Sequence, residues 1–296
     1  MEKVIVVRYG EIGLKSYWVR REFEKRLMDN ISRALLENKI EIEKIKQIGA
    51  RIYIWCDKIN KALKILKNVF GIVSYSPAFI IKTDLNEMKK MAVKLFRKSG
   101  GKKFRITTRR RFKQFPLTSM QISSKIGEYV IEKTGAKVDL EKYDTNISFE
   151  VVDKKNTFAF YEFLRGWGGL PIGTQGKVLC VVSSKKESWV NAWLMARRGC
   201  EIVLAGIKPN LKKYASKFEK KYYFFENELN FYDVSKSKSH IERIIDVAKL
   251  ENVKAIVVCN KDIGKFESKT DLLIFYPSLG YPTKKINEIW AEMGLD

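Results

Sequence analysis

From Lys177 onward, short apolar segments alternate with longer amphipathic ones, and this alternation constrains the fold more than any other feature. Strands buried on both faces of a sheet read as short apolar runs, and helices that cross between parallel strands supply the segments between them. The pattern predicts a doubly wound parallel sheet over residues 177–296. The expected strands are 177–182, 201–206, 222–226, 253–258 and 271–277, and the expected helices are 189–199, 240–250 and 284–294.

In such a sheet, ligands bind beyond the carboxyl ends of the strands, so the loops after Val182 and after Cys259 are the expected sites. The first loop leads into a helix, whose N-terminal N–H groups can hold a phosphate. Because this loop contains no glycine, we expect it to hold a phosphate or an RNA backbone only loosely. Its residues are Ser183, Ser184, Lys185, Lys186, Glu187 and Ser188.

The first half of the chain predicts two further domains. Residues 1–76 show strand, amphipathic helix, two strands and a second helix, an order typical of a ferredoxin-like α+β unit. Residues 77–166 show helix (86–99), strand (103–111), helix (119–135) and two strands (146–152 and 157–163). A glycine-rich linker is expected at 167–176. The chain is therefore predicted to be a multidomain protein of α/β and α+β class.

The charge of the chain favours a polyanionic partner. Lysine and arginine number 57 against 34 acidic residues, a formal charge of +23, and nucleic acid is the first candidate. An anionic membrane surface is the rival, although no apolar run approaches the roughly 18 to 20 residues needed to span a bilayer. The first apolar segment is too short for a signal peptide, so we expect a cytoplasmic protein.

More than half of the excess charge falls in one window. Between Glu87 and Glu128 there are thirteen lysines and arginines and no acidic residue. A period of two places Phe104 and Ile106 on one face of the strand and Arg105, Thr107, Arg109 and Arg111 on the other. This face suits phosphate and ribose contacts, and a solvated strand edge is the alternative. The candidate RNA-binding residues are Lys102, Lys103, Arg105, Arg109, Arg110, Arg111 and Lys113.

The four cysteines and the single histidine do not predict a metal site. No Cys-x-x-Cys pair is present, and His240 has no neighbouring ligand in the sequence. Free cysteine is among the most buried residue types, so we expect buried hydrophobic roles for Cys56, Cys180, Cys200 and Cys259.

Several motifs in order along the chain resemble the tRNA 4-thiouridine sulfurtransferase family. The resemblance covers nearly the whole chain and implies a ferredoxin-like domain, a THUMP domain and an ATP pyrophosphatase (PP-loop) domain. The motifs are RYGEIGLKS (8–16), RRRFKQFP (109–116), VDLEKYD (138–144), GGLPIGTQGKVL (168–179), VVCNKDIGKFESKT (257–270) and YPSLGYPTKKINEIWAEMG (276–294).

The resemblance implies a division of labour. The first two domains of the family hold tRNA, with THUMP at the acceptor stem and 3′ end. The third activates a uracil carbonyl by adenylation, and a cysteine persulfide delivers sulfur. A homodimer is also implied, and ATP and magnesium are implied as cofactors only if the PP-loop still works; no metal ligand is assigned.

The chain departs from the family where the chemistry takes place. The family loop is S-G-G-x-D-S, whereas here both glycines are absent and Glu187 replaces the aspartate. The loop 233–240, where the family carries its cysteine, has none, so Cys259 is the remaining weak candidate. In the second loop Asp262, Gly264, Ser268 and Thr270 fit the pattern, whereas Lys265 and Lys269 replace glutamines.

These departures favour a tRNA-binding protein without adenylation or sulfur-transfer activity of its own. Two alternatives stay open at this point. One is an active, ATP-dependent tRNA sulfurtransferase with an altered PP-loop. The other is a subunit that brings tRNA to a separate modifying enzyme.

Overall fold

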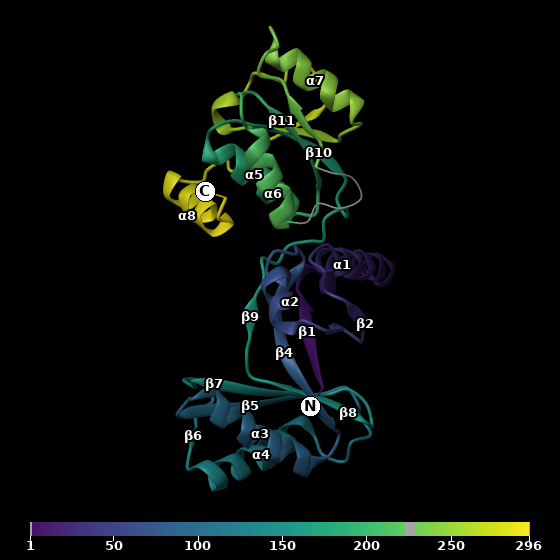
Figure 1. Cartoon of the computed structure of the whole chain (residues 1–296), viewed down its shortest axis with the longest axis vertical. Helices are drawn as coiled ribbons and strands as arrows, with labels where there is room; N and C mark the ends of the chain where they lie inside the picture. Colours follow the sequence, from purple (N-terminus) through teal and green to yellow (C-terminus); the bar gives the residue numbers. More distant parts are fainter. Residues whose placement is uncertain (1, 223–228, 296) are drawn as a thin grey trace. The chain divides into compact units, whose positions relative to one another are not determined.

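The computed structural model describes residues 2–222 and 229–295 (Figure 1). The chain divides into two compact units. The first unit comprises Met1–Arg8, Ile40–Lys64 and Ser74–Arg165. The second comprises Tyr9–Lys39, Ile65–Val73 and Gly166–Asp296. Within the described ranges, no helix combines the length and the apolar character that crossing a membrane requires. The three-domain boundaries expected from the sequence stay a prediction.

The first unit is built on a sheet in the order β2-β3-β1-β4-β8-β7-β5-β6, with β9 also paired to β4. The strands at its ferredoxin-like end match the expected segments closely. The strands are β1 (Lys3–Tyr9), β2 (Ile42–Gln47), β3 (Ile52–Cys56), β4 (Ile72–Lys82), β5 (Lys103–Arg110), β6 (Lys137–Val138), β7 (Thr145–Val151), β8 (Asn156–Phe160) and β9 (Leu164–Arg165).

Strand β4 was not predicted from the sequence. It is the longest strand of the sheet, and it crosses the boundary expected at residue 76. Its proline makes it an unusual central strand, since proline lacks an N–H to donate to a neighbouring strand. In the structure Pro77 lies between Ser74–Tyr75, which pair with β9, and Phe79–Lys82, which pair with β8. The strand thus places its proline where neither of these pairings needs a donor.

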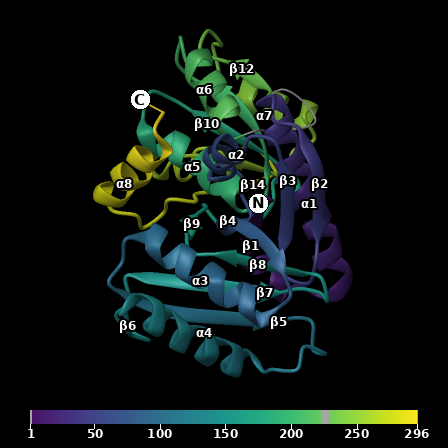
Figure 2. The ribbon, with the colours of Figure 1, turned by 60° about the horizontal axis from the view of Figure 1, so that its bottom comes forward.

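Helices α3 (Leu85–Ser99) and α4 (Ser119–Thr134) lie side by side on one face of β5 and β7 (Figure 2). Both begin at capping side chains. Asp84 accepts hydrogen bonds from the first turn of α3, and Thr118 forms a reciprocal capping box with Gln121 in α4. Each ends at a glycine with left-handed φ, Gly100 or Gly135. The sequence signals therefore fix both helices close to the expected positions.

The opposite face of this sheet carries a smaller apolar cluster with a buried carboxylate. Val6, Tyr53 and Phe158 belong to the cluster. Glu150 of β7 is buried beside them, where it accepts hydrogen bonds from Arg51 Nε at 3.1 Å and from the Tyr53 hydroxyl at 2.8 Å. This pairing lets a charged group occupy the interior of the unit.

The second unit contains the predicted parallel sheet, in the order β12-β11-β10-β13-β14, and each of the four neighbouring strand pairs is parallel. The doubly wound prediction is confirmed: residues of α5, α6 and α8 pack in the core on one side, and residues of α7 pack in the core on the other. The order reverses between β10 and β13, which is the topological switch point. The elements are η1 (Glu11–Leu14), α1 (Tyr17–Glu37), β10 (Lys177–Val182), α5 (Lys186–Arg197), β11 (Glu201–Gly206), α6 (Lys212–Tyr222), β12 (Phe231–Asp233), α7 (His240–Leu250), β13 (Ala255–Val257), η2 (Asn260–Asp262), β14 (Leu273–Phe275) and α8 (Thr283–Met293); helix α2 (Ile59–Leu66) spans the division between the units.

Three expectations for this unit need revision. Helix α5 begins at Lys186 rather than at residue 189, because the polar turn supplies its first residues. Helix α6 was not predicted, although Ala215, Phe218 and Tyr222 form its buried stripe. Of the strand expected at 222–226, Tyr222 ends α6 and the other residues lie outside the described part of the chain.

The core of the second unit includes residues from the N-terminal part of the chain. Phe70 stacks on Tyr222 with ring centroids 5.3 Å apart and meets Trp193 edge-on at 5.8 Å. Asn30 of α1 is buried and donates from Nδ2 to the Ile172 carbonyl at 3.2 Å. Hydrophobic burial thus joins segments that the sequence assigned to different domains.

We predict that Glu150→Ala destabilises the first unit by about 3 kcal/mol, because Arg51, whose side chain is only 13% exposed, would lose its counter-charge. Hydrogen exchange of β3 and β7 peptides across a urea titration measures the effect. Glu132→Ala is the matched control: its ion pair with Lys133 is exposed, so no measurable change is expected. Equal stability of the two variants would contradict a structural role for Glu150.

Candidate nucleic-acid interface and nucleotide loop

The crevice at the switch point is bridged by one carboxylate. Glu187, in the first turn of α5, accepts a hydrogen bond at Oε1 from the backbone N–H of Asn260 at 3.0 Å. The same oxygen accepts from the Ser278 hydroxyl at 3.2 Å, and Asn260 Nδ2 donates to the Ser278 carbonyl at 3.2 Å. Three segments that follow β10, β13 and β14 are therefore tied together through Glu187.

The loop after β10 satisfies much of its hydrogen bonding internally. The Ser183 N–H donates to Ser188 Oγ at 3.0 Å, and this hydroxyl donates to the Lys185 carbonyl at 2.7 Å. The Lys185 N–H donates to Ser183 Oγ at 3.2 Å. Ser183 and Ser188 are buried, whereas Ser184, Lys185 and Lys186 are exposed. The two serines that match the family pattern therefore close the loop on itself.

The backbone of this loop explains why it tolerates the loss of glycine. Lys185 has φ −81° and ψ 132°, an extended conformation open to any L-residue. Over the described ranges, the non-glycine residues with positive φ are Lys39, Asn210 and Asn252, all outside the loop. A pyrophosphate cradle needs free N–H groups and close backbone approach. In this conformation the N–H groups of Ser183 and Lys185 are occupied and Glu187 is engaged, so these groups are not free to hold a pyrophosphate.

The cysteine candidate is not activated. Cys259 follows β13 and is 4% exposed. Burial, followed by the negative charges of Glu187 and Asp262, raises the pKa of its thiol to about 12. A thiol is nucleophilic as the thiolate, so this environment opposes chemistry at neutral pH.

Two of the other cysteines are buried as expected, whereas Cys56 is only half-buried. Cys180 and Cys200 are buried, and burial raises the pKa of Cys200 to about 11. Loop 233–240 contains no thiol, and Ser239 caps α7 by accepting from the Glu242 N–H at 3.4 Å. Among residues 2–222 and 229–295, no cluster of three or more His, Cys, Asp or Glu side chains has the arrangement of a metal site.

The second loop carries its own counter-charge. Lys265 Nζ lies 2.7 Å from Asp262 Oδ1. Gly264 has φ 81°, and Thr270 Oγ1 accepts from the Leu272 N–H at 3.2 Å, while Ser268 is exposed. Lys265, which replaces a glutamine of the family pattern, thus pairs with Asp262, which fits that pattern.

The alternation predicted for β5 is confirmed. Phe104 and Ile106 are buried in the core beneath α3 and α4. On the other face, Arg105 Nε donates to Thr107 Oγ1 at 3.2 Å, and its guanidinium lies 4.9 Å from the Tyr143 ring centroid. Arg109 is exposed on the same face as Arg105.

The position of β5 in the sheet is consistent with both an RNA-binding face and a solvated strand edge. Strand β7 pairs with β5 from Phe104 to Arg110, whereas β6 pairs only with Lys103 and Phe104. Within the described residues, the arginine-bearing part of β5 is therefore an edge. Such an edge can bind a polyanion or can be kept soluble by charge.

The candidate RNA-binding residues divide into two groups. Arg110 Nη1 donates to the carbonyls of Phe115 and Leu117, each at 2.7 Å, and so holds the turn that precedes α4. Arg111 Nη1 donates to the Ile48 carbonyl at 3.1 Å and fills the space next to Gly49, where a Cβ would clash with it. Lys103 Nζ pairs with Asp139 at 3.0 Å. The side chains of Lys102, Arg109 and Lys113 are exposed.

Arg8 of β1 belongs to the charged face near Glu150 but was not identified from the sequence. Its guanidinium lies 4.7 and 5.0 Å from the ring centroids of Phe160 and Phe163, and Nη1 donates to Ser76 Oγ at 3.0 Å. Burial lowers its pKa to about 10, so it stays charged at neutral pH. The apolar residues around Arg8 in the sequence of β1 do not indicate these contacts.

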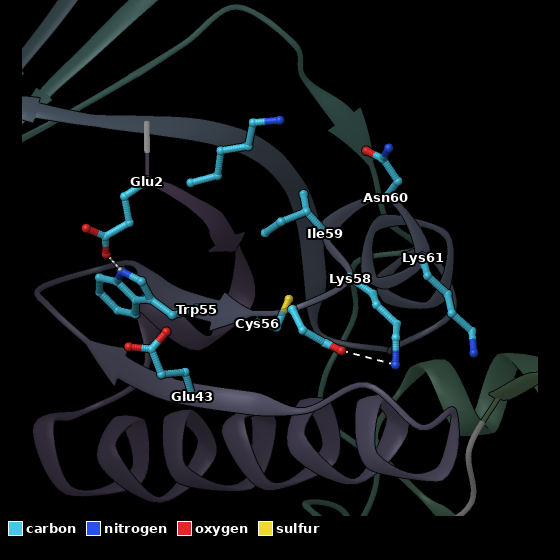
Figure 3. A pocket seen from close by; sticks show the side chains of 10 residues that line it. Glu2, Glu43, Trp55, Cys56, Lys58, Ile59, Asn60 and Lys61 are labelled. Carbon is cyan, nitrogen blue, oxygen red and sulfur yellow. Dashed lines mark hydrogen bonds and ion pairs between the residues drawn. The ribbon is translucent and has the colours of Figure 1, made fainter.

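The first unit also contains an open pocket of about 660 Å³ beside β3 and α2 (Figure 3). Trp55 donates from Nε1 to Glu2 at 3.0 Å, and Asp57 pairs with Lys58 at 3.1 Å. Burial and Asp57 raise the pKa of the half-buried Cys56 thiol above its usual range. The lining contains three carboxylates and three ammonium groups, with Glu2 and Glu43 on one side and Lys58 and Lys61 on the other (Figure 3), so the formal charge of the pocket is balanced.

Family models match three segments of the chain. Residues 4–76 match the ThiI ferredoxin-like domain, residues 82–159 match the THUMP domain, and residues 173–249 match the model described as thiamine biosynthesis protein (ThiI). The matches follow the order in which the sequence motifs predicted these domains.

Similar proteins and solved structures agree with these matches. A probable tRNA sulfurtransferase of Thermococcus kodakarensis is 43% identical over 209 residues, 69% of this chain and 55% of that protein. One of Methanocaldococcus jannaschii is 38% identical over 279 residues, 90% of this chain and 72% of that protein. The chain thus spans about half of the first relative.

Two crystal structures share the fold. PH1313 from Pyrococcus horikoshii has a TM-score of 0.84 at 32% identity, with 99% of each chain covered. A 4-thiouridine synthetase in complex with RNA and ATP has a TM-score of 0.81 at 21% identity, covering 100% of this chain and 86% of that one.

We predict that Cys259 resists alkylation in the native protein at neutral pH, because its thiol is buried and protonated. Peptide mass spectrometry after timed treatment with iodoacetamide should show Cys56 modified well before Cys259. Full modification of both in urea serves as the control. Labelling of native Cys259 at the rate of an unfolded cysteine would show an accessible thiolate and restore it as a sulfur carrier.

Proposed function

The chain belongs to the tRNA sulfurtransferase family, and on this premise we propose that it binds tRNA but neither activates nor thiolates it. The chain spans only part of the length of its relatives. The activity and substrate of those longer proteins therefore do not transfer directly to this chain. The proposal therefore depends on the residues of this chain.

The basic face of the THUMP segment supports RNA binding. Lys102, Arg109 and Lys113 are exposed in a window of thirteen basic and no acidic residues. Phosphate contacts of this kind supply most of the sequence-independent affinity for nucleic acid. The related 4-thiouridine synthetase, crystallised with RNA, makes RNA the polyanion to test first.

The hydrogen bonds that Glu187 accepts from Asn260 and Ser278 are the main support for the proposed loss of adenylation. At the switch point, where a parallel sheet of this kind binds its ligand, the carboxylate is bonded to Asn260 and Ser278 instead. Lysines in the loop attract phosphate but do not orient it, because an ammonium on a flexible stem lacks fixed geometry. Sulfur transfer has a second obstacle, since loop 233–240 lacks a thiol and Cys259 is buried.

We predict that replacing Lys102, Arg109 and Lys113 with alanine weakens tRNA binding and makes log K less dependent on log salt. The slope should fall by roughly 0.7 to 0.9 for each phosphate that the protein no longer neutralises. Fluorescence anisotropy at several salt concentrations measures both quantities. Alanine at Lys212, Lys213 and Lys249, exposed lysines of the second unit, removes the same charge and is the matched control.

The outcome separates a binding face from a solvated edge. Equal weakening in both triple variants would indicate a general charge effect and count against the β5 face. Arg110→Ala should instead lower the free energy of unfolding by about 2 kcal/mol, because it removes two charge-assisted hydrogen bonds.

We predict that the unaltered protein neither binds ATP tightly nor forms thiolated nucleoside with tRNA, ATP, magnesium and free sulfide. Free sulfide bypasses the missing cysteine and isolates the adenylation step. Calorimetry and nucleoside mass spectrometry measure the two properties. Thiolated nucleoside from the unaltered protein would identify an active sulfurtransferase with an altered loop.

A paired substitution tests the role of the Glu187 bridge. Ser184→Gly with Lys185→Gly opens the loop but keeps the bridge, whereas adding Glu187→Asp shortens the bridging side chain. Only the triple variant is expected to gain ATP affinity. An equal gain in ATP affinity in the double and the triple variant would show that the missing glycines alone obstruct ATP binding.

A further inference from the structure

The start of α1 exposes a group of large apolar side chains. Leu14, Tyr17 and Trp18 are 88%, 64% and 75% exposed. The rings of Tyr17 and Trp18 meet edge to face with centroids 5.2 Å apart and planes at 76°. Single exposed apolar residues are common, but adjacent ones of this size indicate an interaction surface.

Basic side chains surround this aromatic pair. Arg21 Nη1 lies 3.4 Å from the Tyr17 hydroxyl, with its guanidinium 5.8 Å from the ring centroid. Lys15 and Lys25 are exposed in the same segment, and Glu22 is an exposed carboxylate among them.

Two nearby carboxylates are already paired with arginines. Glu24 is buried and accepts from Arg20 Nε at 2.8 Å, and Glu11 lies 3.1 Å from Arg198. The exposed charge around the aromatic pair is therefore net positive.

The helix holds the aromatic pair on a fixed support. Phe23, Leu27 and Ile31 bury the opposite stripe of α1. A rigid backbone reduces the conformational entropy that binding removes, so Tyr17 and Trp18 are presented as a preorganised surface.

We infer that Tyr17 and Trp18 form a stacking platform for an unpaired base of the bound RNA. Aromatic side chains beside basic residues bind single-stranded nucleic acid by stacking and phosphate attraction. Charge complementarity favours RNA as the occupant, because RNA is a polyanion and the exposed charge around the aromatic pair is net positive. The inference rests on the proposed RNA binding and adds the part of the RNA that α1 recognises.

The test compares two RNA duplexes with the same paired segment, one blunt at both ends and one with a short unpaired overhang. With the full chain, Tyr17→Ala combined with Trp18→Ala should weaken binding of the overhang duplex by about tenfold or more. Affinity for the blunt duplex and the salt slope should stay unchanged. Trp18→Phe keeps an aromatic face and should retain most of the affinity, and Tyr281→Ala, at an exposed tyrosine distant in sequence, is the matched control.

The outcomes separate this inference from the function on which it rests. If the unaltered chain binds neither duplex, RNA binding itself fails. If it binds both and the double variant behaves like the unaltered chain, only the platform is overturned. Sedimentation that shows a dimer of the unaltered chain and a monomer of the double variant, with equal RNA affinity, would assign the surface to a second copy and overturn the platform.

Discussion

The carboxylate of Glu187 spans the point where the parallel sheet of the second unit reverses its order. Loops after three strands converge there, and each carries polar groups that need partners away from bulk water. By accepting from Asn260 and Ser278, Glu187 supplies those partners from within the protein. The loop hydrogen bonds of Ser183 and Ser188 and the pairing of Lys265 with Asp262 satisfy further polar groups internally, whereas the buried Asn260 Oδ1 has no hydrogen-bond partner within the described residues.

Much of the fold followed from periodicity, and the exceptions have physical reasons. The period of two in β5 placed Phe104 and Ile106 in the core, and the segments 201–206 and 240–250 form β11 and α7 at the expected residues. Strand β4 was missed, and the domain boundary expected at residue 76 falls inside it; the pairings on either side of Pro77 do not use its missing N–H. Periodicity is a local property, and β4 depends on partners far away in the sequence.

The site was less predictable, because hydrogen-bond partners are set by tertiary structure. The sequence identified Glu187 as a departure from a motif, but its contacts to Asn260 and Ser278 join residues separated by 73 and 91 positions. It also grouped Arg110 with its neighbours, although its side chain holds the turn before α4. Arg8 and Glu150 show the same limit, since both are charged residues within strands and only the fold reveals what surrounds them.

The interleaving of the two units along the chain has a consequence for synthesis on the ribosome. Helix α1 ends at Glu37, but its unit is completed by segments that begin at Gly166, including α5 up to Arg197. At roughly 5 to 20 residues per second, some 10 to 30 s pass between the emergence of α1 and that of α5. During this interval Asn30 of α1 lacks its partner at the Ile172 carbonyl, and Phe70 lacks Trp193 and Tyr222. The nascent chain therefore needs either transient protection of these side chains or temporary non-native contacts that the second unit later replaces.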